Sequence, residues 1–281
     1  MGFRLGTIDG RPVLVTDKGA YDLERHSKGS FSSDSMEAVA RYTELHEVSA
    51  GLSGDPDVAL DAANFGPCVT RPQKSLGIGL NYRDHAEESQ MDIPETPLVF
   101  SKIPSCIVGP TDDIIVYGPT TDWEAELVVC MGTTARDIPA DKAWDHIAGL
   151  TCGQDISERT TQFLTRPPQF DLGKSFDTYG PIGPYIVSVD QFENPSDIGL
   201  TCDLNGERKQ DARTTDLIFD VPALVAYIST ICTLEPGDLI FTGTPSGVGF
   251  TTGTFLKDGD VVTTTIEGIG TMTNRCIAPK K

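Results

Sequence analysis

The sequence predicts a β-rich α+β fold, in which many short strands are joined by turns and helices are few. Apolar runs of strand length recur from about residue 71 to the C-terminus, separated by glycine and proline. Stretches with helical periodicity are few, unlike the regular strand–helix alternation of a doubly wound parallel sheet. With 281 residues, of which 38% are hydrophobic, the chain has room for one large domain and a small appendage.

The first 67 residues are expected to form a small N-terminal α+β domain. Residues 3–16 alternate on either side of Asp9-Gly10, a dipeptide typical of a two-residue hairpin turn. Residues 32–48 begin with capping residues and carry apolar residues at helical spacing, which predicts a helix. The next stretch is rich in Gly, Asp and Pro and indicates the end of this unit near Pro67. We therefore predict two domains, 1–67 and 68–281.

The second part is expected to alternate strands with short connections. The apolar runs predict strands over residues 75–80, 97–102, 113–117, 123–132, 149–155, 183–188, 200–206, 238–244 and 261–268. Helices are expected over residues 81–91, 140–148, 157–164 and 221–232. The Gly-rich turn at 242–250 contains neither GxGxxG nor a Walker lysine, so it does not predict a phosphate cradle.

Charge and cysteine content narrow the classes of partner. The net charge of −19 comes from dispersed carboxylates and disfavours nucleic acid and anionic membranes as partners. No apolar run approaches the roughly 20 residues that span a bilayer, and the N-terminus lacks the pattern of a secretion signal. The seven cysteines are scattered and none forms CxxC. We expect reduced, buried thiols in a cytoplasmic protein.

Two glutamates stand two residues apart in the apolar run DWEAELVVC. On a strand, Glu124 and Glu126 share a face, while Trp123, Ala125 and Leu127 point the other way. Adjacent carboxylates near a core repel each other unless a cation compensates them, and hard divalent cations prefer oxygen ligands. The pair therefore indicates a metal site; the alternative is a solvated strand face with two ordinary glutamates.

Asp155 strengthens the metal hypothesis. It ends the apolar strand predicted at 149–155, where strand-end functional groups commonly lie. The alternative role is a helix N-cap, which Ser157 could fill instead. Three carboxylates with no His or Cys nearby favour Mg²⁺, or Mn²⁺, over zinc. Such a site leaves coordination positions open for substrate oxygens and water.

A histidine and a glutamate in the helix predicted at 81–91 could form a dyad. His85 and Glu88 are three residues apart, so they lie on one helix face within reach of each other. A carboxylate beside an imidazole raises its basicity, as the deprotonation of water requires. The alternative is a surface helix with incidental charges, and Asp84 and Glu87 are expected to face solvent.

Four further polar residues could contact a substrate. Arg159, one helical turn beyond Asp155, could clamp a carboxylate, with Gln162 beside it. Lys174, in a loop of Gly, Asp, Thr and Pro, could stabilise an oxyanion. Thr244 ends the strand predicted at 238–244, next to turn N–H groups that could bind a carboxylate. Taken singly, each has a plain alternative: a surface ion pair, an exposed lysine or a tight turn.

The order of these motifs resembles the fumarylacetoacetate hydrolase family. The segments are NYRDHAEE, PLVFSKIPS, DWEAELVV, GQDISERTTQ, GKSFDTYGPIGP and TGTPSGVG, and the resemblance covers residues from about Arg71 to the C-terminus. The chain is similar to bacterial members that include 2,4-diketo-3-deoxy-sugar-acid hydrolases, acylpyruvate hydrolases and 2-hydroxyhepta-2,4-diene-1,7-dioate isomerases. The resemblance implies a mixed β-roll or barrel-like catalytic domain, as in the fumarylacetoacetase C-terminal type, and a homodimer.

The resemblance also implies roles for the candidate residues. Mg²⁺ would be bound by Glu124, Glu126 and Asp155. His85 and Glu88 would form the catalytic dyad, with Lys174 also catalytic. Substrate contacts would come from Arg159, Gln162 and Thr244.

We expect a Mg²⁺-dependent hydrolase that converts an acylpyruvate, a small keto acid, into pyruvate and a carboxylic acid. The alternatives on the same site are decarboxylation of oxaloacetate and isomerisation or hydration of a 2-hydroxydienoate. A non-catalytic β-rich binding protein is a further alternative, although every motif position is filled. A zinc hydrolase is disfavoured, because no His or Cys ligand set is present.

Overall fold

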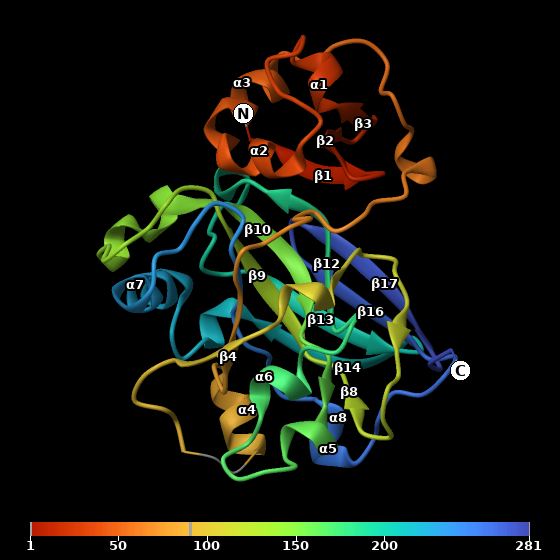
Figure 1. The fold of residues 1–281 in the computed structure, drawn as a ribbon, viewed down its shortest axis with the longest axis vertical. Helices are drawn as coiled ribbons and strands as arrows, with labels where there is room; N and C mark the ends of the chain where they lie inside the picture. The colour runs from red at the N-terminus through yellow and green to blue at the C-terminus, as the bar shows by residue number, and fades with distance from the viewer. Residues whose placement is uncertain (1, 90–91, 281) are drawn as a thin grey trace.

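A computed structural model describes residues 2–89 and 92–280 of the chain. Most strands belong to two sheets, and a short pair stands apart (Figure 1). The larger sheet has 10 strands in the order β3 (Gly19–Asp22), β2 (Arg11–Thr16), β1 (Arg4–Ile8), β12 (Gly180–Val187), β10 (Ile147–Gln154), β9 (Ala125–Met131), β15 (Leu239–Phe241), β4 (Ser75–Gly79) and β5 (Leu98–Ser101), with β6 (Ile107–Val108) paired to β12.

The smaller sheet has five strands and packs against one face of the larger sheet. Its order is β14 (Glu207–Arg213), β13 (Gly199–Leu204), β16 (Val261–Ile266), β17 (Gly270–Ile277) and β7 (Ile114–Ile115), and the separate pair is β8 (Thr121–Asp122) with β11 (Ser157–Glu158). Parallel pairs such as β15–β4 and β17–β7 occur among antiparallel ones. The predicted β-rich, mixed α+β class is confirmed, and the described sheets remain open.

Helices are short and lie outside the sheets. The α-helices are α1 (Leu23–His26), α2 (Ser35–Ala40), α3 (Tyr42–Ala50), α4 (Arg83–Glu88), α5 (Arg159–Gln162), α6 (Phe170–Gly173), α7 (Val221–Ile231) and α8 (Gly249–Thr252). Single 3₁₀ segments cover Leu60–Ala62, Pro104–Cys106, Ala140–His146, Val189–Gln191 and Thr214–Asp216. Helices α4, α5, α6 and α8 gather at the end of the molecule opposite the N-terminal segment (Figure 1).

The central strands β9 and β10 are buried along their whole length. One face packs on the smaller sheet, where Leu127 and Leu150 share an apolar cluster with Leu200. The other face packs on the N-terminal segment, where Val128 shares a cluster with Leu5. Burial on both faces explains why these strands are almost continuous apolar runs.

The N-terminal segment joins the larger sheet through β1. The predicted hairpin at Asp9-Gly10 is confirmed, with both residues at positive φ, 50° and 75°. Strand β1 pairs with β12, where Leu5 lies opposite Ile186. The division of the chain at residue 67 stays a prediction, since the segment extends the sheet of the second part.

Four element predictions differ from the structure. The helix predicted at 32–48 is two helices, α2 and α3, which meet at Arg41, whose φ of −111° is not helical. Residues 140–146 form a 3₁₀ segment instead of an α-helix, and the helix expected at 157–164 begins only at α5, after β11. Strands β14 and β17 were not predicted. The helix predicted to reach residue 91 ends at Glu88; residues 90 and 91 lie outside the described part.

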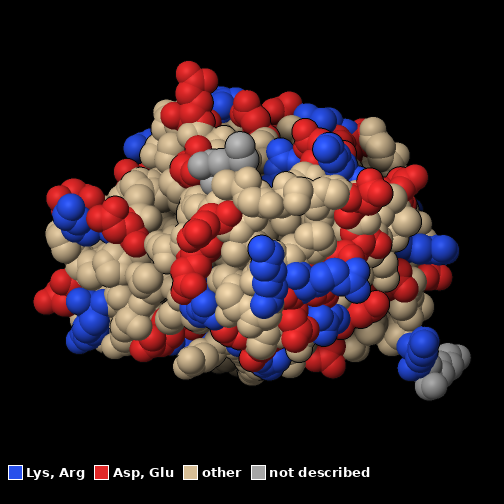
Figure 2. All heavy atoms as spheres, turned by 90° about the horizontal axis from the view of Figure 1, so that it is seen from above, with Lys and Arg blue, Asp and Glu red and all other residues tan. Residues whose placement is uncertain are grey.

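The surface carries charges of both signs. On the face that Figure 2 shows, acidic side chains are spread in small groups with basic ones among them. Among the described residues, no helix is long and apolar enough to cross a membrane. The exclusion of nucleic acid and membrane surfaces as partners stays a prediction. None of the seven cysteines is in a disulfide, and Cys232 alone among them is not fully buried.

Candidate active site

Three carboxylates meet where β9 begins and β10 ends. Glu126 lies in β9 opposite Gly153 of β10, and Asp155 follows β10 directly. The backbone N–H of Asp155 donates to the carbonyl oxygen of Glu124 at 2.9 Å. Strand pairing thus brings Glu124, Glu126 and Asp155 together, with one oxygen from each within 4.8 Å of the others. No other cluster of this kind occurs within the described ranges.

Burial and neighbouring charges shift the pKa values of two of these carboxylates in opposite directions. Glu126 is only 1% exposed and receives a hydrogen bond from the backbone N–H of Gly243 at 2.7 Å. Burial, and then the charges of Asp155 and Glu124, raise the pKa of Glu126 well above its usual range. The pKa of Glu124 is lowered to about 2, because Lys174 and Arg159 outweigh the opposing effect of burial. Within the described part of the chain, Glu126 has no lysine or arginine partner.

The buried charges around the trio do not cancel. With every group ionised, four buried carboxylates would face three buried cationic side chains, one negative charge in excess, and the raised pKa of Glu126 reflects this imbalance; the residues are Asp122, Glu124, Glu126, Asp155, Lys102, Arg159 and Lys174. A buried charge without a partner is costly. An all-oxygen donor set with excess negative charge fits a hard divalent cation such as Mg²⁺ or Mn²⁺.

Lys174 lies against the trio. It immediately follows the short helix α6, which replaces the loop that the sequence predicted. Its Nζ donates to Glu124 Oε2 at 2.6 Å, to Asp155 Oδ2 at 2.7 Å and to Ser157 Oγ at 2.8 Å. The lysine is 2% exposed. The plain alternative of an exposed lysine is therefore wrong, and all three of its N–H donors are in use.

Lys102 is a site residue that the sequence analysis missed. Its Nζ donates to Asp155 Oδ1 and to the carbonyl oxygen of Lys174, both at 2.6 Å. Burial acts to lower the pKa of Lys102, but the charge of Asp155 prevails and raises it. A signal was present in the run PLVFSK, where a lysine directly follows an apolar strand. Lys102 fixes both the carboxylate of Asp155 and the backbone at Lys174.

Arg159 is buried and faces carboxylates other than Asp155. Its Nε and Nη2 both donate to Asp122 Oδ2, at 2.9 and 2.7 Å, and Nη2 also donates to Glu124 Oε1 at 2.6 Å. Nη1 donates to Gln162 Oε1 at 2.9 Å. The surface pair of Asp155 with Arg159, the plain alternative, does not form. The forked side of the guanidinium that we expected to hold a substrate carboxylate is occupied by Asp122.

Asp122 is a second residue that the sequence analysis missed. Besides Arg159, its carboxylate accepts backbone N–H bonds from Gly249 at 2.7 Å and Phe250 at 3.0 Å. It is fully buried, and burial raises its pKa even though Arg159 opposes the shift. One carboxylate therefore fixes both the arginine of the site and the start of α8.

Replacing Asp122 with asparagine is expected to destabilise the protein by about 3 kcal/mol, because Arg159 keeps only one of its two anionic partners in a buried site. Urea unfolding followed by circular dichroism measures this change. The matched control is Asp211→Asn, where the side chain is 70% exposed and the expected change is below about 0.5 kcal/mol. Equal stability of the two variants would show that Asp122 does not hold the site together.

The expected His85–Glu88 dyad is only partly assembled. His85 Nδ1 lies 3.6 Å from Glu88 Oε2, too far for a hydrogen bond, and this nitrogen is buried with no partner in the described structure. Glu88 instead accepts from the backbone N–H of Gly247 at 3.1 Å and from Thr251 Oγ1 at 2.8 Å. Burial acts to raise the pKa of Glu88, whereas His85, Thr251 and Gly247 lower it, and the net shift is downward.

Helix α4 is held against the turn that follows β15. Asp84, which the sequence analysis placed in solvent, accepts a hydrogen bond from Ser246 Oγ at 2.6 Å. Together with Glu88, it ties both ends of α4 to residues 246–251. Thr244 in the same turn accepts from Gln210 Nε2 at 2.8 Å and donates to the carbonyl oxygen of Ala125 at 2.9 Å.

A hollow of about 330 Å³ opens onto these groups. Its polar side chains are His85, Ser89, Glu124, Arg159, Gln162, Lys174 and Thr244. The rest of its wall is apolar. His85, Lys174, Arg159, Gln162 and Thr244 thus share one hollow, whereas Glu88 is not part of the wall.

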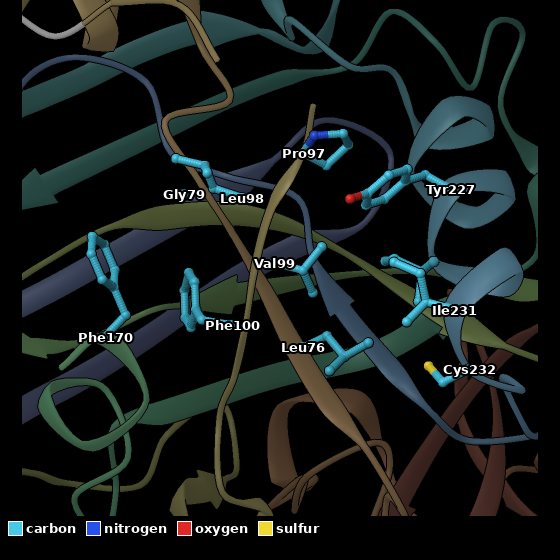
Figure 3. Close-up of a pocket in the computed structure, with 11 residues that line it drawn as sticks. Leu76, Gly79, Pro97, Leu98, Val99, Phe100, Phe170, Tyr227, Ile231 and Cys232 are labelled. Carbon is cyan, nitrogen blue, oxygen red and sulfur yellow. The ribbon is translucent and has the colours of Figure 1, made fainter. Parts of the chain in front are cut away.

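A second hollow of about 590 Å³ lies on the outer side of β5, between this strand and α7. Leu98, Phe100 and Phe170 line both hollows. In Figure 3 the rings of Phe100 and Phe170 lie side by side, away from α7, while Val99 lies toward Ile231 of that helix. Strand β5 and α6 therefore form the partition between the two hollows.

Comparisons with known proteins agree with this geometry. The profile of the fumarylacetoacetate (FAA) hydrolase C-terminal family matches residues 74–277. A crystal structure from Mycobacterium smegmatis, provisionally named an HpcE protein, has 40% identity and a TM-score of 0.92, covering 99% of this chain and 100% of that one.

Two further solved structures are similar. 2-Hydroxyhepta-2,4-diene-1,7-dioate isomerase from Mycobacterium marinum has 32% identity and a TM-score of 0.76, with 100% of both chains covered. Maleylpyruvate hydrolase from Sphingobium sp. SYK-6, in complex with manganese(II) ion and pyruvate, has 26% identity and a TM-score of 0.83, covering 99% of this chain and 100% of that one. With the family profile covering most of the sequence, the chain belongs to the fumarylacetoacetate hydrolase family.

Proposed function

We propose that this chain is a divalent-metal-dependent enzyme that hydrolyses the C–C bond of a 2,4-diketo acid to give pyruvate and a carboxylic acid. The observation that carries the proposal is the buried trio of Glu124, Glu126 and Asp155, of which Glu124 lines the same hollow as His85 and Lys174. A family relative with bound manganese(II) and pyruvate supports it.

The trio would hold Mg²⁺ or Mn²⁺, with Glu126 as the member that has no cationic partner of its own among the described residues. When bound, such an ion supplies Lewis acidity toward the oxygens of a 2-keto acid. It would also reverse the excess negative charge of the site, which favours an anionic substrate.

His85 is the group proposed to take a proton from water. Its imidazole ring lines the hollow, so it can reach a water molecule held there, while the buried Nδ1 lies toward Glu88, 3.6 Å from Oε2. The resulting hydroxide attacks the carbonyl carbon distal to the carboxylate. The bond between that carbon and C3 then breaks, the electron pair stays on C3, and a proton converts the pyruvate enolate to pyruvate.

Lys174 and Gln162 are proposed to stabilise the oxyanion that forms on the attacked carbonyl. Lys174 has all three donors in use, so this role requires it to leave one carboxylate or Ser157. Gln162 Oε1 accepts from Arg159, which leaves its amide N–H groups to donate. Arg159 thus orients the amide of Gln162, besides any contact it makes with substrate.

Pyruvate release, coupled to lactate dehydrogenase, tests the proposal on acylpyruvates, 2,4-diketo sugar acids and oxaloacetate. Each assay is run with Mg²⁺, with Mn²⁺ and with EDTA. Metal-dependent pyruvate from a diketo acid is the expected result. Pyruvate from oxaloacetate alone would replace hydrolysis with decarboxylation, and none from any substrate would refute both.

Glu126→Gln is expected to weaken Mn²⁺ binding by about 10- to 100-fold, because one of three carboxylate ligands becomes a neutral amide. The backbone N–H of Gly243 can still donate to the amide oxygen, so the fold should persist. Titration calorimetry with Mn²⁺ measures the affinity, and Glu158→Gln, outside the trio, is the control. Unchanged affinity in Glu126→Gln would place the metal elsewhere.

A second candidate is isomerisation or hydration of a 2-hydroxydienoate on the same residues. A family relative named 2-hydroxyhepta-2,4-diene-1,7-dioate isomerase, with 32% identity to this chain, favours it. Loss of dienoate absorbance without pyruvate release would identify this activity.

We also propose that the protein is a homodimer and that it is located in the cytoplasm. The homodimer rests on the family resemblance, and sedimentation velocity at micromolar concentration would test it. The cytoplasmic location rests on seven thiols, none of which forms a disulfide.

A further inference from the structure

The hollow of the site is chemically divided. Its polar lining includes His85, Lys174 and, from the carboxylate trio, Glu124. The rest of the lining is largely hydrocarbon side chains from β5, α6, α8 and the residue after α5, with Arg159 5.6 Å from the Phe250 ring centroid and Lys174 Nζ 5.3 Å from that of Phe100. A bound 2,4-diketo acid must place its carboxylate and both keto groups on the polar side. Its variable acyl group then lies against the apolar side.

Two phenylalanine pairs form much of that apolar wall. Phe163 and Phe250 are stacked, with ring centroids 5.2 Å apart and an interplanar angle of 25°. Phe100 and Phe170 lie 5.7 Å apart at 38°. Phe163 and Phe250 are 44% and 48% exposed, unusually open for aromatic rings, so each offers uncovered apolar surface. All four rings line the same hollow.

The wall offers no free cation to a second carboxylate. Arg159 and Lys174 are the lysine and arginine side chains that line the hollow among the described residues. All three donors of Lys174 and the forked side of Arg159 are already bonded to protein oxygens. Arg166 is exposed and does not line the hollow. A carboxylate held against these rings would lose part of its hydration and gain no charge partner in return.

We infer that the acyl group of the substrate is apolar, an aryl or an extended alkyl group held between the two phenylalanine pairs, and that it does not end in a second carboxylate. This inference rests on the proposed function, which identifies the diketo acid end of the substrate. The preference for an apolar acyl group depends only on the residues of the wall, whichever bond of the substrate is cleaved. The same hollow would discriminate against the diacid substrates implied by the names of some relatives.

The first test compares benzoylpyruvate, acetylpyruvate and a 2,4-diketo acid with a terminal carboxylate, by pyruvate release. Benzoylpyruvate is expected to have kcat/KM about 10- to 100-fold above acetylpyruvate, from the added apolar contact. The diacid is expected to be at least about 100-fold below benzoylpyruvate. A diacid that equals or exceeds benzoylpyruvate overturns the inference and leaves the proposed hydrolysis standing.

Variants of the wall residues test which side chains cause the preference for an apolar acyl group. Phe250→Ala is expected to lower the ratio of the benzoylpyruvate to the acetylpyruvate kcat/KM by about 10-fold. Leu164→Ala is the control, because Leu164 adjoins Phe163 and is 74% exposed but does not line the hollow.

Leu98→Arg, at a 44% exposed wall position, is expected to raise activity on the diacid relative to benzoylpyruvate. It provides a second test if Phe250→Ala does not fold. Reduced diacid activity in Arg166→Ala would show that this arginine serves the substrate, against the inference.

If no diketo acid is cleaved, ligand binding can still test the inference about the acyl group separately from the proposed hydrolysis. Titration calorimetry of the Mn²⁺-loaded protein compares 2-oxo-4-phenylbutanoate with 2-oxoglutarate, which differ by phenyl against carboxylate at the same carbon. Tighter binding of the phenyl compound by about 10-fold or more would support the apolar wall even though the hydrolase proposal had failed. Equal or tighter binding of 2-oxoglutarate would overturn the inference whatever the reaction.

Discussion

Replacing His85 with alanine is expected to lower kcat by roughly two to four orders of magnitude while leaving Mn²⁺ affinity nearly intact. The imidazole lines the hollow, and it does not belong to the carboxylate trio. Coupled pyruvate release gives kcat, and calorimetry gives the metal affinity. Full activity in His85→Ala would remove the histidine from the mechanism.

Two companion variants make this result specific. His26→Ala, in the N-terminal segment beside Asp57, should leave kcat unchanged, because it lies outside the site. Glu88→Gln should lower kcat by only about 10-fold, since Glu88 contacts Gly247 and Thr251 more closely than His85. If Glu88→Gln were as inactive as His85→Ala, the dyad would have to close fully in the complex with substrate.

Lys174→Met is expected to abolish most activity and to change how the metal affects stability. Loss of an oxyanion donor lowers kcat by about 10²- to 10³-fold. Without metal, Glu124 and Asp155 lose a buried cation, which costs roughly 3–5 kcal/mol. Mn²⁺ can compensate these carboxylates, so the rise in Tm on adding Mn²⁺ should be larger in Lys174→Met than in the wild type. Thermal unfolding with and without Mn²⁺ measures this difference.

The control for this variant is Lys142→Met, at a position whose side chain is 60% exposed. It should lose little stability, and its response to Mn²⁺ should match the wild type. An equal metal-induced rise in Tm for Lys174→Met and the wild type would mean that Lys174 and the metal do not share the same carboxylates.

The sequence was informative where a local pattern determines the geometry. Strand alternation predicted that Glu124 and Glu126 share a face, and their carboxylates do meet in the trio, although β9 begins only at Ala125. The Asp9-Gly10 turn formed as predicted, because few other dipeptides accept positive φ at both positions. Strand β17 had a usable signal that was overlooked, with Met272, Asn274 and Cys276 buried on alternate positions. Strand β14 had none, since most of its side chains are polar and it lies at a sheet edge.

Helix ends and side-chain partners were less predictable. The helix expected at 32–48 breaks at Arg41, whose side chain packs over Phe31 and pairs with Glu37 and Glu44. Helical periodicity does not reveal such a break, because the residues around it keep their apolar spacing. Spacing also suggested His85 with Glu88 and Asp155 with Arg159, but neither pair forms a hydrogen bond.

By itself the sequence determined the family and the β-rich class, and it named candidate residues for the chemistry, because motifs and strand alternation can be read directly from the chain. Tertiary structure alone decided the partners: Asp122 for Arg159, Lys102 for Asp155, and residues 246–251 for α4. It also decided that four phenylalanines from separate segments form one wall. The physical reason is that these contacts join residues distant in sequence, whose proximity depends on how the two sheets pack.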